Sequence, residues 1–103
     1  MREQYGELIG QLIGIFADTT PDTLAQLRDA SERGDAKTTR AVAHTLKGAC
    51  QNVGATAMAD LCRGLEADPA ASGLERLQAL FAPTLTALRD AAASDPERAH
   101  QRL

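Results

Sequence analysis

Ala41-Val-Ala-His-Thr-Leu-Lys-Gly-Ala-Cys-Gln-Asn-Val-Gly54 is the stretch that predicts a helix with two very different faces. At about 100° per residue, its larger apolar side chains fall in one arc. These residues are Val42, Leu46, Ala49, Cys50 and Val53. The opposite side carries Arg40, His44, Lys47 and Gln51, with Gly48 at its edge. One face is therefore suited to burial in a core, whereas the other presents polar groups to solvent.

Gly48 is an unexpected residue in the middle of this helix. A glycine there destabilises a helix by about 1 kcal/mol relative to alanine. It lies one turn after His44 on the polar side, so the missing side chain leaves open space beside the imidazole. This arrangement favours a site that another molecule approaches.

The composition indicates one all-α domain. Of the 103 residues, 44% are hydrophobic and only 3% are aromatic. The net charge of −3 argues against nucleic acid and acidic membranes as partners. The chain has no apolar run of about 18 residues that could span a bilayer, and its N-terminus opens no signal peptide. We therefore expect a cytoplasmic protein without membrane insertion.

Turn and capping residues divide the chain into five predicted helices. They cover 3–18, 21–32, 36–53, 56–67 and a last segment from 72 to about 93. Thr20-Pro21 is a helix start signal, and Gly34 and Gly54 are stop signals. Short connections predict an antiparallel up-down four-helix bundle, with the additional N-terminal helix packed on it or capping it. The domain would span residues 1–94, followed by a frayed C-terminal tail at 95–103.

Cys50 and Cys62 fall in two different predicted helices, and we expect them to be buried free thiols. No CxxC or Glu-x-x-His motif accompanies them. A metal- or haem-binding bundle, in which His44 or His100 pairs with Cys50, Cys62 or acidic ligands, is therefore the weakest alternative. We expect no metal or other cofactor bound by this chain.

The polar face of residues 40–51 carries groups that phosphoryl transfer to nitrogen requires. A neutral imidazole is a nucleophile, and cations stabilise the charge on phosphoryl oxygens. Lys47 lies three residues after His44, Gln51 seven after it and Arg40 four before it. A surface histidine is often only a polar residue, so spacing alone leaves that interpretation open. The chain has no nucleotide-binding loop and no carboxylate cluster on this face, so the phosphoryl donor and its metal would come from other proteins.

The sequence around His44 resembles the signature of histidine-containing phosphotransfer (HPt) domains of two-component phosphorelays. His44-Thr-Leu-Lys-Gly48 with Gly54 is similar to H-x-L-K-G-(x)5-G. The segment 16–27 looks like the F-x(4)-P-x(2)-L-x(2)-L helix start, and 61–66 looks like the L-C-x-x-L-E stretch. Gly34-Asp35 is similar to the pair that precedes the histidine helix. The resemblance covers about residues 8–92, although residues 49 and 50 lack the small hydroxyl side chains frequent in the family.

This resemblance implies a role for each residue of the polar face. His44 would accept the phosphoryl group through Nε2, Lys47 would contact that group, and Gly48 would clear space for a receiver domain. Glu66 falls where the family often has Gln or Glu that hydrogen-bonds the imidazole Nδ1. The helical pattern alone does not bring Glu66 to His44. Docking would use the His44 helix and an apolar rim, with the candidates Ile13, Ala41 and Ala43.

The resemblance also implies a phosphocarrier without catalytic activity of its own, hence not an enzyme. Its partners would be response-regulator receiver domains and a hybrid sensor histidine kinase, and the Mg²⁺ would belong to the receiver. Two alternatives stay open. The domain could be a non-catalytic adaptor that binds receivers, or the substrate domain of a larger hybrid or chemotaxis-type histidine kinase.

Overall fold

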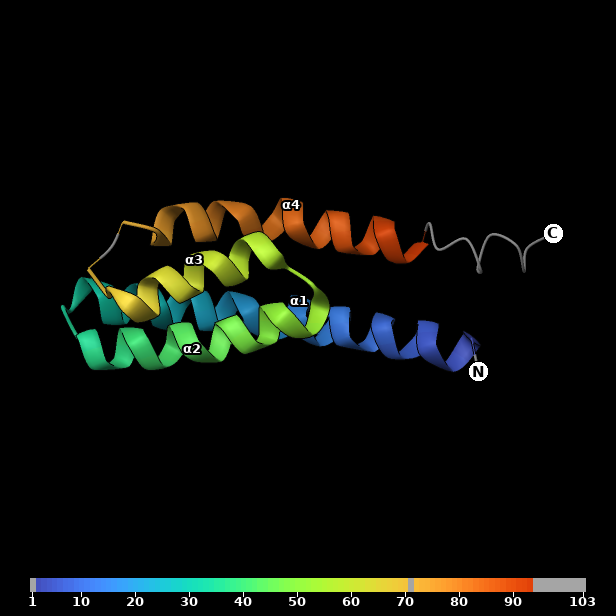
Figure 1. The fold of residues 1–103 in the computed structure, drawn as a ribbon, viewed down its shortest axis with the longest axis horizontal. Helices are drawn as coiled ribbons and strands as arrows, with labels where there is room; N and C mark the ends of the chain where they lie inside the picture. Colours follow the sequence, from blue (N-terminus) through green and yellow to red (C-terminus); the bar gives the residue numbers. More distant parts are fainter. Residues whose placement is uncertain (1, 71, 94–103) are drawn as a thin grey trace.

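The computed structural model describes residues 2–70 and 72–93, and this part of the chain forms four α-helices. They are α1 (Arg2–Glu32), α2 (Ala36–Val53), α3 (Thr56–Ala67) and α4 (Leu74–Ala93). The helices run alternately up and down, with α2 packed against α1 and α3, and α4 packed against the same two helices (Figure 1). The predicted all-α antiparallel bundle is confirmed. The predicted tail at 95–103 and His100 lie outside the described residues.

The predicted break at Thr20-Pro21 is wrong, because α1 continues through it. The expected additional N-terminal helix is therefore the first half of α1, and the bundle has four helices. Pro21 has no N–H to donate to the carbonyl four residues earlier, which normally kinks or ends a helix. Here Thr19 Oγ1 donates to the main-chain oxygen of Ile15 at 2.8 Å, and Thr23 Oγ1 donates to that of Thr19 at 3.1 Å.

Tertiary packing explains why the two halves of α1 stay in line. Phe16 precedes the proline and Leu24 follows it, and both are buried in the same hydrophobic core. The ring of Phe16 also packs against that of Phe81 in α4, with centroids 5.7 Å apart. In the continuous α1, both side chains face that core. The cost of the proline is therefore offset by burial on both sides of it.

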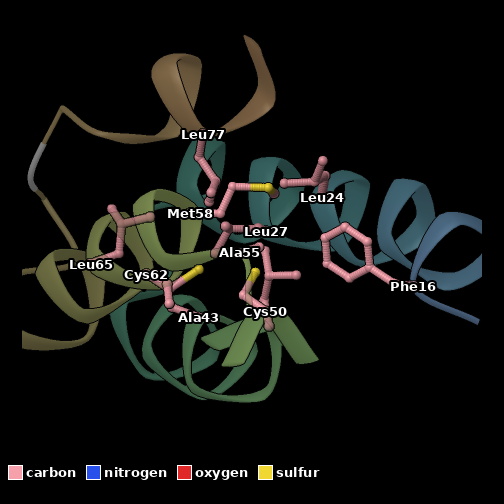
Figure 2. Packing of buried hydrophobic residues seen from close by; sticks show 12 residues of the cluster. Phe16, Leu24, Leu27, Ala43, Cys50, Ala55, Met58, Cys62, Leu65 and Leu77 are labelled. Atoms are coloured by element: carbon pink, nitrogen blue, oxygen red, sulfur yellow. The ribbon is translucent and has the colours of Figure 1, made fainter. Parts of the chain in front are cut away.

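The core lies between the four helices and is almost entirely aliphatic and sulfur-containing (Figure 2). On α2, Leu46 and Cys50 are fully buried, as the apolar arc predicts. Cys50 and Cys62 are free and buried, as expected from the sequence. A hydrogen bond with Cys50, together with burial, raises the pKa of the Cys62 thiol, so this thiol stays protonated.

The two ends of α2 fix its place in the bundle. At its start, the Asp35 carboxylate accepts a hydrogen bond from the Thr38 main-chain N–H at 3.1 Å. At its end, Gly54 adopts the left-handed conformation with φ 78°, and the Ala55 N–H donates to the carbonyl of Cys50 at 2.8 Å. This tight turn sends the chain straight back into α3. No helix among the described residues is long and apolar enough to cross a membrane.

Candidate functional site

His44 lies on the outer face of α2, and its side chain is 72% exposed. Its neighbours explain this direction, because Ala43 and Leu46 point into the core and are 0% and 1% exposed. The helical period then turns the intervening positions outward. The imidazole is therefore available to a partner, as the sequence predicts.

Glu66 reaches the histidine from α3. Its Oε1 is hydrogen-bonded to Nδ1 of His44, and its Oε2 accepts a hydrogen bond from Nζ of Lys47 at 2.5 Å. The Glu66 side chain is 17% exposed and that of Lys47 is 20% exposed, so both lie much deeper than the imidazole. The structure thus joins three of the predicted site residues in one cluster, which we call the His44–Glu66–Lys47 cluster.

The charge of Glu66 determines which nitrogen of His44 is free. The hydrogen bond from Lys47, and a second one from His44, hold the pKa of the Glu66 carboxyl below its ordinary value, although burial acts in the opposite direction. An ionised carboxylate only accepts hydrogen bonds, so Nδ1 of His44 must carry the proton. The lone pair of the neutral ring is then on Nε2, which is a nucleophilic position.

Arg40 lies one turn before His44, as predicted, and it contacts the main chain of Glu66. Its Nε donates to the main-chain oxygen of Glu66 at 3.0 Å. Gln51 is exposed on α2, and the hydrogen bonds found for the described residues do not connect it with His44 or Glu66. The role predicted for Gln51 stays a prediction.

Gly48 does leave open space. A Cβ atom added to it would meet no atom within 4 Å outside its own helical turn. Two of the three candidates for an apolar rim are wrong, because Ile13 is 6% exposed and Ala43 is fully buried. Ala43 directly precedes His44, so the turn of the helix that exposes the histidine buries the alanine. Ala41 is exposed, as the rim requires.

Sequence reasoning from helical periodicity missed the contact between Glu66 and His44, which only the family resemblance implied. The length of the α2–α3 hairpin is a signal that could have found it. His44 lies ten residues before Gly54 and Glu66 lies twelve after it. In an antiparallel pair, residues at similar distances from the turn lie side by side.

No group of three or more His, Cys, Asp or Glu side chains in the described parts of the chain is placed to hold a metal ion. The site itself consists of one exposed imidazole, one carboxylate that fixes its proton, and one ammonium. Such a site can exchange a group that arrives already activated on another molecule.

A model of the family described as "Hpt domain" matches residues 11–95, which include all four helices in part or whole. Searches of curated proteins and of solved structures found no significant match. Because the matched region covers most of the chain, the protein belongs to the HPt domain family, whose members are phosphocarrier modules of two-component systems and interact with receiver domains.

Proposed function

We propose that this domain carries a phosphoryl group on Nε2 of His44 and exchanges it with an aspartate of a response-regulator receiver domain. The observation that carries the proposal is the hydrogen bond between Nδ1 of His44 and the Glu66 carboxylate. It leaves Nε2 as the nucleophilic nitrogen of an imidazole that is 72% exposed. We further propose that the exchange takes place in the cytoplasm, as expected from the sequence.

The transfer step follows from these positions. The Nε2 lone pair attacks the phosphorus of an aspartyl phosphate, an N–P bond forms, and the P–O bond to the aspartate breaks. The aspartate leaves as a carboxylate, and the phosphorylated ring keeps its proton on Nδ1. Glu66 stabilises the positive charge that develops on the ring, because its carboxylate already accepts from Nδ1. The same step in reverse returns the phosphoryl group to a receiver.

Lys47 has two tasks in this proposal. An ammonium group has three N–H donors, and one of them is used on Glu66 Oε2. The other two remain to donate to phosphoryl oxygens one turn from His44. We also propose that Mg²⁺ comes with the receiver, as the resemblance implies, so that this chain supplies only the nucleophile and its immediate surroundings.

The experiment that tests the proposal is a transfer assay with phosphorylated receiver domains encoded in the same genome. The wild-type domain should take up label that is acid-labile and alkali-stable, as expected of phosphohistidine. His44→Gln should take up none, and circular dichroism should show that it remains helical. Label that persists in His44→Gln would refute the assignment. A wild-type domain that binds receivers without taking label from any receiver or kinase would support the adaptor alternative.

Gly48 provides a separate test of access by a macromolecule. Gly48→Gln should remain folded, because the added Cβ meets no atom within 4 Å outside its own helical turn, and the glutamine side chain should obstruct a docking receiver. We expect transfer from a receiver to fall by about tenfold or more, as for a misplaced reactant. Phosphorylation by the small donor phosphoramidate should change much less. Equal losses with both donors would show that the substitution damages His44 itself.

A further inference from the structure

The Arg40 side chain is hydrogen-bonded to the main chain of Glu66. Its Nε donates to the Glu66 carbonyl oxygen at 3.0 Å. This carbonyl lies in the last turn of α3 (Thr56–Ala67), where the last four carbonyls of a helix have no partner within the helix. The last turn of α3 has no basic residue of its own. The guanidinium from α2 therefore supplies both a donor and a positive charge to the end of α3.

Glu66 is consequently held at two places. Arg40 holds its main-chain oxygen, while Lys47 and His44 hold its two carboxylate oxygens. All three of these side chains come from α2, and Glu66 comes from α3. A carboxylate stays aligned with Nδ1 only if the backbone that carries it keeps its position relative to α2.

We infer that Arg40 is a positioning residue, which fixes the last turn of α3 so that the Glu66 carboxylate stays on Nδ1 of His44. It thereby keeps the proton on Nδ1 and the lone pair on Nε2. The consequence for phosphoryl transfer rests on the proposed function, whereas the positioning itself is measurable without any partner. The inference differs from the role that the sequence predicts, in which the charge of Arg40 acts directly on the phosphoryl group.

The first experiment measures the tautomer of His44 from the ¹⁵N chemical shifts of its ring at a pH where the ring is neutral. The wild-type domain should show the proton on Nδ1. Arg40→Gln should shift the population toward the form with the proton on Nε2. Arg63→Gln is the matched control, because Arg63 is an exposed arginine of α3 that pairs with Asp60 at 2.7 Å. It should leave the tautomer unchanged. An unchanged tautomer in Arg40→Gln would overturn the inference.

The second experiment separates positioning from direct charge. Phosphoramidate transfers its phosphoryl group to Nε2 and releases ammonia, so it reports the reactivity of His44 without a protein partner. We expect Arg40→Gln to slow this reaction by about tenfold. In a Glu66→Ala background, the same substitution should have almost no effect, because no carboxylate remains to be positioned. An equal loss in both backgrounds would show that the charge of Arg40 acts directly, and would overturn the inference.

The two proposals can fail independently. If no receiver or kinase phosphorylates the wild-type domain while Arg40→Gln still shifts the tautomer, the proposed function fails and the positioning role stands. If receivers phosphorylate His44 normally but the tautomer does not respond to Arg40, the positioning role fails and the proposed function stands. Amide hydrogen exchange in α3 shows in either case whether its last turn has frayed.

Discussion

Glu66 contacts His44 and Lys47 of α2 through its two carboxylate oxygens. Two substitutions of Glu66 can therefore distinguish the contact with His44 from the contact with Lys47. Glu66→Gln keeps an oxygen that accepts from Nδ1 of His44, but its amide nitrogen cannot accept from Lys47. Glu66→Ala loses both contacts. We expect Glu66→Gln to accept a phosphoryl group at close to the wild-type rate, and Glu66→Ala to be about tenfold slower or worse.

Initial rates of labelling by one phosphorylated receiver check this prediction, with thermal melts of both variants as the control for folding. If the two variants lose activity equally, Lys47 and not the hydrogen bond to Nδ1 is the important partner of Glu66. If neither loses activity, the contacts of Glu66 with His44 and Lys47 have no part in transfer.

Thr20 is the second residue with an unusual environment. Its side chain is 1% exposed, and its hydroxyl oxygen has no hydrogen-bond partner in the described part of the protein. Thr39 is equally buried, but its hydroxyl donates to the main-chain oxygen of Asp35 at 2.8 Å. An unpaired buried polar group costs about 1–3 kcal/mol, whereas a satisfied hydrogen bond contributes about 1 kcal/mol.

Replacing Thr20 and Thr39 by valine should therefore change the free energy of unfolding in opposite directions. Thr20→Val removes the unpaired hydroxyl at nearly constant shape, and should raise the free energy of unfolding by about 1 kcal/mol. Thr39→Val removes a hydrogen bond and should lower it by about 1 kcal/mol. Urea denaturation of both variants measures these changes. A loss of stability in Thr20→Val as large as that in Thr39→Val would show that the Thr20 hydroxyl does have a partner.

At the scale of the elements, Gly48 within α2 and Gly54 directly after its last residue have different reasons to be glycine. Gly54 ends the helix with φ 78°, where a side chain is strained, and its turn sets the register between α2 and α3. Gly48 lies within the helix and has open space around it. Gly54 is thus required by the fold, whereas Gly48 is free to leave space for a partner that approaches His44.

Replacing each glycine by alanine should distinguish these two reasons through the free energy of unfolding. Gly54→Ala should lower the free energy of unfolding by about 1–2 kcal/mol, because a left-handed residue with a Cβ is strained. Gly48→Ala should raise it by up to about 1 kcal/mol, because alanine is the better helix former and meets no clash. Thermal or urea denaturation of the two variants provides the measurement. A stabilised Gly54→Ala would mean that the turn between α2 and α3 is not under the strain that its φ indicates.

The limits of the helices show which local sequence signals predict structure and which do not. The predicted limits of the helices at 36–53 and 56–67 agree with α2 and α3, because a capping aspartate and a left-handed glycine are local signals. The Thr20-Pro21 signal is just as clear, but it lies inside α1. Burial of Phe16 and Leu24 on both sides of it decided the outcome. A local signal has no information about the core that forms around it.

For the molecule as a whole, the stability of the folded domain depends on pH through two carboxyl groups. Hydrogen bonds from the Thr38 hydroxyl and main chain hold the pKa of Asp35 below its ordinary 3.8, and those from Lys47 and His44 hold that of Glu66 below its ordinary 4.5. A carboxyl whose pKa is lower in the folded chain binds its proton more readily after unfolding. Its contribution is therefore fully present above the ordinary pKa and is lost as the pH falls through the lowered value.

We accordingly expect stability to decline as the pH drops below about 4.5, and further below 3.8. Asp35→Asn combined with Glu66→Gln removes both titrations, so the difference in unfolding free energy between wild type and this variant should shrink with acidity. Urea denaturation between neutral pH and pH values below 3.8 tests this expectation. A difference that stays constant over the whole range would show that neither carboxyl is linked to folding.

By itself, the sequence determined the all-α class, the two faces of the helix at 36–53, and the exposed histidine with a lysine and a gap beside it. These features depend on the period of one helix and on its caps, which are written in neighbouring residues. Only the tertiary structure decided that α1 runs through Pro21, that Ile13 and Ala43 are buried, and that Glu66 and Arg40 meet across α2 and α3. Contacts between helices depend on the rotation and register of each helix against its neighbours, which are set by packing of the whole core.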